Sequence, residues 1–459
     1  AGWASRRPSR AAAAAVVTLA LVLTVGVGAP RWFVAHERDS VLGPAAFPGA
    51  LREQDSAPRT RWSAVVDGSV VPVVAGDVVV AVAGTPPAGR RLVGLDVVGG
   101  DPRWSVPLGD APAPETVLCR ALDPLLACVV GPEPPSDRRR AETSDPDTTA
   151  READASALLL LDPADGAVLA RHALDGWAVA TAQAGPELVV ASYAWGMLTV
   201  RRVDAVTGAV RWETERWSTF MSAGSSRVRL VAAGDLVTAS GNEVTLVLDA
   251  RTGERVPRPE GSSVADETRL LQDGTLVRTR YRPGASGGGT VSELSTGSGA
   301  PWATVRGAFV EPGVSDGTAG LVFAASGLAG GPLGGRVRAY RPGSTEEVWR
   351  APARSADVAV DAAGRVVLRA AGALVGLDAA TGEEVWRRSF GVPVRRAFTD
   401  GERVVVEHQS ADGLDAVTAL ALDDGETDWE TVLPADAPRL LRIGAHLYAL
   451  GDERLVALR

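Results

Sequence analysis

Over most of the chain, apolar residues occur in short runs bounded by glycine, aspartate and proline, as in β-strands joined by tight turns. The clearest stretch is Ala373–Phe390, with the sequence ALVGLDAATGEEVWRRSF. It predicts a strand over Ala373–Leu377, a turn, and a second strand that carries Trp386. The turn is expected because Asp378 can accept hydrogen bonds from the backbone two residues on, and because the glycine that follows adopts a positive φ at little cost.

The same pattern recurs along the chain. Further copies lie at Leu92–Asp96, Val200–Trp212, Thr245–Val256, Arg336–Trp349 and Ala419–Trp429. Asp162, Asp204 and Asp249 are spaced by 42 and 45 residues, and Asp378 and Asp423 again by 45. In each unit a two-stranded hairpin precedes the strand before the turn and the tryptophan-bearing strand, so each unit supplies four strands. Serial four-stranded units of this length predict an all-β fold, a β-propeller over residues 61–459.

The two ends of the repeat array predict a closed ring. The last unit stops after its third strand, Arg454–Arg459, whereas an additional tryptophan-bearing strand, Thr60–Val66, precedes the first unit. If that strand completes the last blade, the ring closes with no free sheet edge. This count gives nine units. The unit that ends at Val291–Trp302 is degenerate, so a ring of eight blades remains the alternative.

The N-terminal segment has a different pattern. Residues 1–10 carry three arginines, and residues 11–30 are almost entirely apolar, long enough to span a bilayer as a helix. The positive-inside rule places residues 1–10 in the cytoplasm and the chain after Pro30 outside. We therefore expect a cytoplasmic tail, a single transmembrane anchor over 11–30, and a proline-bearing stalk over 31–60. A cleaved signal peptide, with small residues before Pro30 as the cleavage site, is the alternative.

Three insertions interrupt the repeats. Residues 131–156 are polar, contain prolines and lack periodicity, which predicts disorder. Residues 282–290 and 327–335 are rich in glycine. All three fall between the second and third strands of their units, so they are expected on one face of the ring, together with the connections between blades. Repeat folds often carry their ligands on such a face, but loops also lengthen wherever nothing forbids it, and both interpretations stay open.

Repeats of the form LDxxTGExxW resemble those of the pyrroloquinoline-quinone-like (quinoprotein-type) β-propeller superfamily, over about Arg61–Arg459. The resemblance implies a propeller in which eight blades are usual. It also implies two branches: quinone- and calcium-dependent dehydrogenases, and non-enzymatic envelope propellers. The dehydrogenases commonly carry adjacent cysteines over the quinone, and this chain has no Cys-Cys pair. We therefore expect the non-enzymatic, membrane-anchored branch, with PQQ and calcium as cofactors only under the dehydrogenase alternative.

The repeated tryptophans are predicted to be structural. In the resembling family, the residue at this place in the repeat docks against the neighbouring blade, and an indole buries a large apolar area while its N–H can still donate a hydrogen bond. The residues assigned to blade docking are Trp62, Trp104, Trp212, Trp302, Trp349, Trp386 and Trp429. The repeated aspartates Asp96, Asp162, Asp204, Asp249, Asp378 and Asp423 are predicted to form turns. None has the spacing of a calcium loop.

Cys119 and Cys128 lie on one predicted hairpin, nearly symmetric about Asp123–Pro124. A cross-strand disulfide between them is one expectation, since the compartment inferred from the anchor permits oxidation. Two buried thiols that pack as small hydrophobic side chains are the other.

Composition narrows the function classes. The net charge is −9 with no lysine, which argues against nucleic acid as the main partner. The four histidines are scattered without ligand spacing, so no metal site and no catalytic residue is predicted. We expect an extracytoplasmic propeller, attached to the cell membrane, that binds a protein or ligand as a scaffold. The alternatives are a quinone- and calcium-dependent dehydrogenase and the sensor domain of an envelope signalling system.

Overall fold

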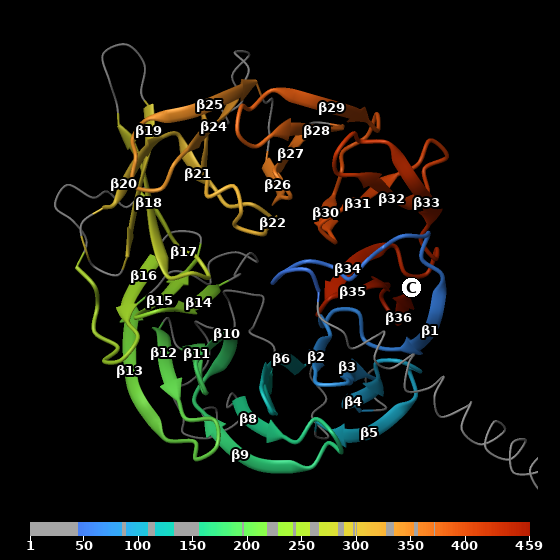
Figure 1. Cartoon of the computed structure of the whole chain (residues 1–459). Coiled ribbons are helices and arrows are strands. Elements are labelled where there is room, and N and C mark those ends of the chain that lie inside the picture. The colour runs from blue at the N-terminus through green and yellow to red at the C-terminus, as the bar shows by residue number, and fades with distance from the viewer. Residues whose placement is uncertain are drawn as a thin grey trace, which may run out of the picture. The chain divides into compact units, whose positions relative to one another are not determined.

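The structure is a computed structural model, and it describes residues 45–84, 89–108, 115–132, 156–194, 197–217, 228–241, 245–257, 266–282, 289–296, 299, 301–326, 335–352, 357–370 and 372–459. These residues form nine sheets arranged in a ring (Figure 1). Each sheet is one blade, and consecutive blades follow one another in chain order. The β-propeller is therefore confirmed, with nine blades rather than eight.

The first five blades are numbered in chain order. Blade 1 contains β2 (Val73–Ala75), β3 (Val78–Ala83), β4 (Arg91–Asp96) and β5 (Pro102–Pro107). Blade 2 contains β6 (Glu115–Leu122), β7 (Leu125–Pro132), β8 (Ser156–Leu161) and β9 (Val168–Leu174). Blade 3 contains β10 (Trp177–Ala184), β11 (Glu187–Ala194), β12 (Met197–Val203) and β13 (Val210–Trp217). Blade 4 contains β14 (Arg229–Ala233), β15 (Leu236–Ser240) and β16 (Thr245–Asp249). Blade 5 contains β17 (Glu267–Leu270), β18 (Thr275–Arg282), β19 (Gly289–Thr296) and β20 (Ala303–Arg306).

The remaining blades complete the ring. Blade 6 contains β21 (Ala308–Val310), β23 (Val322–Ser326), β24 (Arg336–Tyr340) and β25 (Glu347–Pro352). Blade 7 contains β26 (Asp357–Ala362), β27 (Arg365–Ala370), β28 (Ala373–Asp378) and β29 (Glu384–Ser389), to which β22 (Val314–Ser315) is added. Blade 8 contains β30 (Arg396–Thr399), β31 (Arg403–Gln409), β32 (Asp415–Ala421) and β33 (Thr427–Val432). Blade 9 contains β34 (Arg439–Ile443), β35 (His446–Leu450), β36 (Arg454–Leu458) and β1 (Thr60–Val65).

Blade 9 joins the two ends of the propeller. Its outermost strand β1 pairs antiparallel with β36, with Trp62 opposite Ala457 and Ser63 opposite Val456. The predicted completion of the last blade by the strand that precedes the first unit is therefore confirmed. Because the first and last strands of the ring lie in one sheet, the blade leaves no unpaired edge on β36.

The strands differ in burial because the blades stack face to face. The first strand of each blade lies on the inner side of the ring, and neighbouring blades contact each other through β2 and β6, β6 and β10, β10 and β14, β14 and β17, and β26 and β30 (Figure 1). The middle strands are covered on both faces and read as continuous hydrophobic runs, such as VVVAVA in β3. In the outermost strand β29, only Trp386 is buried. The hydrophobic core accordingly lies between blades, as in the cluster that joins blades 1 and 2.

Blade 7 carries an extra strand on its inner edge. Residues Val314 and Ser315 of β22 belong to the connection between β21 and β23 of blade 6, yet they pair in parallel with Val360 and Asp361 of β26. Backbone hydrogen bonds from Gly313 to Val358 and from Asp316 to Asp361 extend the pairing. The buried carboxyl group of Asp361 on β26 lies at this pairing, and Ser315 of β22 donates a hydrogen bond to it. The repeat pattern did not predict it.

Residues 45–59, the second half of the expected stalk, pack against blades 8 and 9; we call them the strap. Leu51 is fully buried among residues of these two blades. The backbone N–H of Leu51 donates to the carbonyl of Thr399, and that of Arg52 donates to the carbonyl of Ala445. The strap is thus part of the folded ring. Residues 1–44, including the expected anchor, lie outside the described residues, and within the described part of the chain no helix has the length and apolarity to cross a membrane.

The strap generates a prediction. Replacing Leu51 with alanine removes a fully buried side chain and is expected to lower the free energy of unfolding by about 2–5 kcal/mol. Replacing Leu414, which is 49% exposed, should change it by no more than about 0.5 kcal/mol. Denaturant unfolding of both variants measures the difference. Equal stability of the two variants would mean that the strap does not contribute to the fold.

Candidate binding site

Five of the predicted docking tryptophans share one contact. Each indole N–H donates to a backbone carbonyl in a turn of the next blade, at 2.8–3.1 Å. The pairs are Trp62 with Val97, Trp104 with Pro163, Trp212 with Ala250, Trp349 with Ala379, and Trp386 with Leu422. Every one of these indoles is buried. The contact satisfies the one polar atom of a large apolar side chain, so each blade is held to the next by packing and a hydrogen bond together.

The turn that receives the indole is built by an aspartate and a glycine. Asp378 Oδ1 accepts hydrogen bonds from the backbone N–H groups of Ala380 and Thr381, as its turn chemistry predicts. Gly382 has φ of 71°, and a Cβ at this position would lie 2.6 Å from the ring of Trp349. A glycine is therefore required for two independent reasons, backbone conformation and the close approach of the indole.

Asp423 lies in the turn of blade 8, but not at the position that Asp378 takes in blade 7. In blade 8, the backbone N–H of Gly425 donates to the carbonyl of Ala421, which corresponds to the bond from Gly382 to Asp378 in blade 7. The position of the turn aspartate is therefore taken by Ala421, two residues before Asp423. The two consecutive aspartates at 423 and 424 concealed this offset in the sequence.

Trp429 docks on the strap. The next blade has no turn after its third strand, since its fourth strand comes from the N-terminal end of the propeller. The indole of Trp429 instead donates to the carbonyl of Gln54 at 2.7 Å. The strap thus supplies the acceptor that the interrupted blade lacks.

Trp302 departs from the pattern of the other tryptophans. In blade 7, Trp386 lies opposite Gly376 in the sheet, and the corresponding pair in blade 5 is Leu294 with Ala303. Trp302 is only half-buried and packs at the edge of the cluster between blades 5 and 6. In blade 2, the His172 ring lies against Gly208 of blade 3, where other blades place an indole. These substitutions were not visible in the spacing.

The interface between blades 4 and 5 is the least filled of those described. Its cluster contains three fully buried residues, Leu236, Leu270 and Leu276. Blade 4 has no docking tryptophan, because Pro257 stands eight residues after Asp249, where Trp386 follows Asp378. Proline has no N–H for a ladder, and the described part of blade 4 has, instead of a fourth strand, only a bridge between Leu248 and Arg255.

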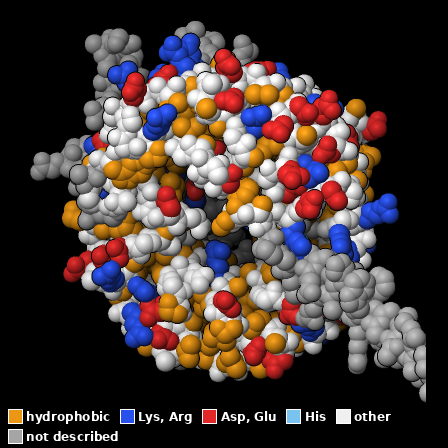
Figure 2. Space-filling model, in the orientation of Figure 1, with side chains coloured by type: hydrophobic (Ala, Val, Ile, Leu, Met, Phe, Trp, Pro, Cys, Tyr) orange, Lys and Arg blue, Asp and Glu red, His pale blue; other side chains and the backbone are white. Residues whose placement is uncertain are grey.

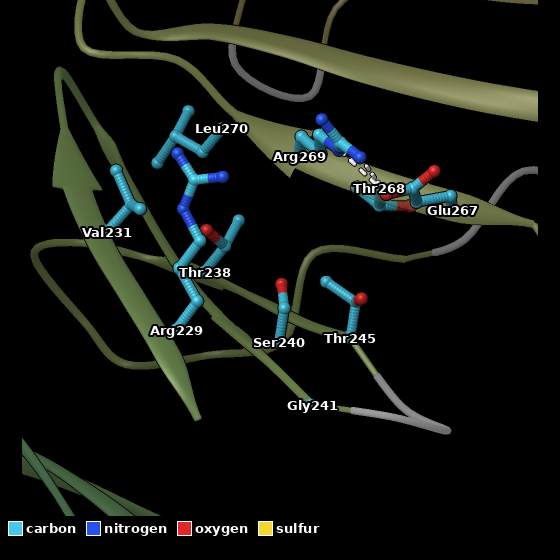
Figure 3. Close-up of a pocket in the computed structure, with 10 residues that line it drawn as sticks. All are labelled: Arg229, Val231, Thr238, Ser240, Gly241, Thr245, Glu267, Thr268, Arg269 and Leu270. Atoms are coloured by element: carbon cyan, nitrogen blue, oxygen red, sulfur yellow. Dashed lines mark hydrogen bonds and ion pairs between the residues drawn. The ribbon is translucent and has the colours of Figure 1, made fainter. Parts of the chain in front are cut away.

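A cleft of about 300 Å³ lies in this interface (Figure 3). Its lining comes from β14 and β15 of blade 4 and β17 of blade 5, and Figure 3 shows Arg229 reaching past Thr238 towards Leu270. The volume is at the lower end for small-molecule and peptide side-chain pockets. We take this cleft as the candidate binding site.

The cleft is polar and close to electrically balanced. Arg269 Nε donates to Glu267 at 2.7 Å, and Arg229, 58% exposed, lies 3.7 Å from Glu311. Hydroxyl groups of Thr238 and Ser240 add donors and acceptors. Such a lining can recognise hydrogen-bonding groups of a bound segment, through its hydroxyl groups and through guanidinium N–H donors that are shared with the ion pairs.

Two buried carboxyl groups lie elsewhere in the ring. Burial raises the pKa of Asp361 to about 6, although Ser315 donates a hydrogen bond to it. Burial also raises the pKa of Glu407, against the attraction of Arg396 and Arg395 at 3.8 and 3.6 Å. Among the residues that the structure describes, no group of three or more His, Cys, Asp and Glu could hold a metal ion. His408 donates to or accepts from Thr418 at 2.7 Å and lies against Phe390, as a structural side chain does.

Cys119 and Cys128 lie opposite each other in the β6–β7 hairpin and form a disulfide, with Cα atoms 4.1 Å apart. The bond crosses two strands of blade 2, and Cys128 is fully buried. The two cysteines are therefore not the adjacent pair that the dehydrogenase resemblance implies.

The three predicted insertions lie largely outside the described residues. Residues 131, 132 and 156 belong to β7 and β8, and residues 133–155 lie outside the described part of the chain. The same holds for most of the two glycine-rich insertions, 283–288 and 327–334.

A ring of four-stranded blades, clamped by one tryptophan contact per repeat in most interfaces, defines a PQQ-like β-propeller. Residues 133–322 and 333–459 match the family described as outer membrane protein assembly factor BamB. Since this match covers more than half of the chain, the chain belongs to that family. No curated protein matches the sequence.

The solved structures to which the chain is similar include a BamB and two dehydrogenases. BamB from Moraxella catarrhalis is 15% identical, with 88% of this chain and 98% of that chain covered and a TM-score of 0.47. The quinohemoprotein alcohol dehydrogenase ADHIIG from Pseudomonas putida HK5 is 12% identical, with 92% and 79% covered and a TM-score of 0.44. A europium-containing methanol dehydrogenase is 12% identical, with 82% and 84% covered and a TM-score of 0.39.

The docking contacts predict the effect of losing Trp62. Its indole is 7% exposed and clamps blade 9 to blade 1, so its replacement with alanine should lower the free energy of unfolding by about 3–5 kcal/mol. Trp386→Ala should have a similar effect. Trp217, 74% exposed on β13, is the matched control, and its replacement should leave the melting temperature nearly unchanged. A Trp62→Ala protein that melts with the wild type would contradict closure through this contact.

The cysteine pair predicts a simple titration result. Protein that is unfolded without reduction should show no free thiol, and two thiols should appear after reduction, because the chain has two cysteines, both in the disulfide. Thiol titration with a chromogenic disulfide measures both values. Two thiols before reduction would show that the residues pack as free side chains.

Proposed function

We propose that the chain is a membrane-anchored, extracytoplasmic scaffold that binds a protein partner and catalyses no reaction. The observation that carries the proposal is the cleft between blades 4 and 5. The cleft lies in a ring that strand β1 closes by completing blade 9. Strands β14, β15 and β17 fix the backbone of the cleft. A site on rigid strands loses little conformational entropy when a partner binds.

The lining of the cleft favours a polypeptide segment as its occupant. Its charged groups are largely paired, as Arg269 is with Glu267, so a strongly charged small molecule would have to displace existing ion pairs. The hydroxyl groups and the Arg229 guanidinium instead offer hydrogen bonds of the kind that backbone amides and polar side chains accept or donate. Membership of the family of an outer membrane protein assembly factor supports a role in binding proteins.

The anchor forms the other part of the proposal. Residues 11–30 supply an apolar segment of membrane-spanning length after three arginines. Residues 31–44 connect this segment to the strap, which begins at residue 45.

The proposal is tested with full-length protein solubilised from its own membranes. Partners recovered with the wild type are compared with those recovered by Ser240→Trp, which fills the cleft, and by Ser389→Trp on the exposed outer strand β29. The Ser240→Trp variant should recover at least about tenfold less partner than the wild type, equivalent to a loss of about 1.4 kcal/mol in binding free energy. The Ser389→Trp control should recover as much partner as the wild type.

Two results would overturn the scaffold proposal. One is reduction of an electron acceptor by purified protein supplied with pyrroloquinoline quinone and calcium. The other is equal partner recovery by both tryptophan variants, which would remove the cleft from the binding site. Recovery of the chain in the soluble fraction would contradict the anchor.

A further inference from the structure

Strand β22 fastens a connection of blade 6 to the inner edge of blade 7. The backbone N–H of Gly313 donates to the carbonyl of Val358, and that of Asp316 donates to the carbonyl of Asp361, both at 3.0 Å. Between these two bonds, β22 pairs in parallel with β26. We call residues 313–316 the β22 latch. Because the latch is so short, it can detach while the other strands of both blades stay paired.

The side chain of Asp361 lies at the contact between the latch and β26. Ser315 Oγ donates to Asp361 Oδ2 at 2.9 Å. Asp361 is 3% exposed, and its Oδ1 atom is buried with no hydrogen-bond partner among the described residues. One hydrogen bond compensates a buried carboxylate poorly, whereas a protonated carboxyl group carries no charge that needs compensation. The closed latch therefore favours the protonated form of Asp361.

The surroundings of Asp361 supply no positive charge to offset its ionisation. Among the described residues, the charged group that acts on it is the carboxylate of Asp316. Opposite Asp361 on β27 lies Val366, which belongs to the apolar cluster between blades 6 and 7. Arg365, the residue before Val366, lies on the other face of the sheet and pairs with Asp423 of blade 8 at 3.2 Å. Ionisation of Asp361 thus brings repulsion from Asp316 and no ion pair.

Asp316 places a lasting negative charge on the latch itself. Its Oδ1 accepts a hydrogen bond from the backbone N–H of Thr318 at 2.7 Å, and its Oδ2 accepts one from that of Ala363 at 2.8 Å. Burial opposes the ionisation of Asp316, but hydrogen bonds from Thr318 and Ala363 outweigh it and lower its pKa. Asp316 is therefore charged wherever Asp361 titrates, and the repulsion between them pushes the latch away from β26.

The direction of the pH response follows from the burial of Asp361. Burial raises the pKa of Asp361 from its ordinary value of 3.8 to about 6. Detachment of the latch lets water reach the carboxyl group, which returns the pKa towards the ordinary value. The closed latch therefore holds the proton more tightly than the open latch. Its stability is greatest below pH 3.8 and is lost progressively as the pH rises to about 6.

Detachment would expose a strand edge at the middle of the ring. Figure 2 shows a hollow there, and Figure 1 places β22 on the inner side of β26. Without the latch, the carbonyls of Val358 and Asp361 lose their donors, and a free strand edge can pair with another extended segment. The same connection carries Glu311, two residues before Gly313, whose carboxylate lies 3.7 Å from Arg229 of the cleft.

We propose that the β22 latch is a pH-responsive device, closed on β26 while Asp361 is protonated and detached when Asp361 ionises. In the detached state, the inner edge of blade 7 is open to the central hollow. Such a latch operates within blades 6 and 7, whether or not the cleft between blades 4 and 5 binds a partner.

Hydrogen exchange of the full-length protein in detergent, followed by mass spectrometry, tests the latch. Exchange of a peptide that covers residues 311–318 is expressed as protection relative to the intrinsic rate at each pH, which removes the direct effect of pH on exchange. Protection should fall about tenfold between pH 5 and pH 7 and change little at higher pH, as a pKa difference between 3.8 and about 6 requires. A peptide from β32 should keep its protection throughout.

Two variants separate Asp361 from other carboxyl groups. Asp361→Asn keeps the size of the side chain and an acceptor for Ser315 but cannot ionise, so protection of its latch should agree within about twofold at pH 5 and pH 7. Glu407→Gln is the matched control, because Glu407 is also a buried carboxyl group with a raised pKa but lies on β31 of blade 8. This control should keep the pH profile of the wild type.

Three results would overturn the proposal. They are constant protection of the wild-type latch between pH 5 and pH 7, an equal fall in Asp361→Asn and wild type, and loss of the fall in Glu407→Gln. The first result needs no variant, so the proposal can be contradicted even if Asp361→Asn fails to fold. Because no partner is present in the measurement, failure of the scaffold proposal would leave its outcome unchanged.

Discussion

The ring depends on a hydrogen bond from a buried indole N–H to a turn carbonyl of the next blade. In the interface between blades 6 and 7, this bond joins Trp349 to Ala379 at 2.8 Å. Gly382 has no Cβ, and this leaves room for the ring of Trp349. A blade alone would expose the apolar face that this indole covers, so it cannot be stable without its neighbour. Each copy of the motif therefore takes part in two interfaces: its turn accepts the indole of the preceding blade, and its tryptophan donates to the turn of the next blade.

This repeated contact explains why the fold could be predicted from the sequence. Each copy of the LDxxTG turn and its tryptophan carries its chemistry in a few adjacent residues, and Trp62 marked the strand that closes blade 9. The sequence pattern was misleading where the residue type occurs near, but not at, the position that makes the interblade contact. Asp423 is displaced by two residues from the turn position, which Ala421 occupies. Trp302 lies next to the docking position that Ala303 takes.

The candidate site could be predicted only in part, because it arises from something that blade 4 lacks. The sequence shows Pro257 at the position of the docking tryptophan. Because proline cannot donate a ladder hydrogen bond, this residue indicates an interrupted fourth strand in blade 4. That the loss leaves a cleft of about 300 Å³ depends on how Leu236, Leu270 and Leu276 fill the interface.

Closure by the N-terminal end of the propeller has a further physical consequence. Because β1 supplies the last strand of blade 9, that blade has no turn to receive Trp429, and the chain segment just before β1 must provide a carbonyl instead. Gln54 does so, and the path it imposes on the strap carries Arg52 to the Gly444–Ala445 turn beside Arg442. The same segment buries Leu51 between blades 8 and 9, so the strap completes both the hydrogen-bond pattern and the apolar core of this interface. A ring whose last blade took all four strands from its own repeat would offer Trp429 a turn carbonyl in that blade and would not need the strap for this contact.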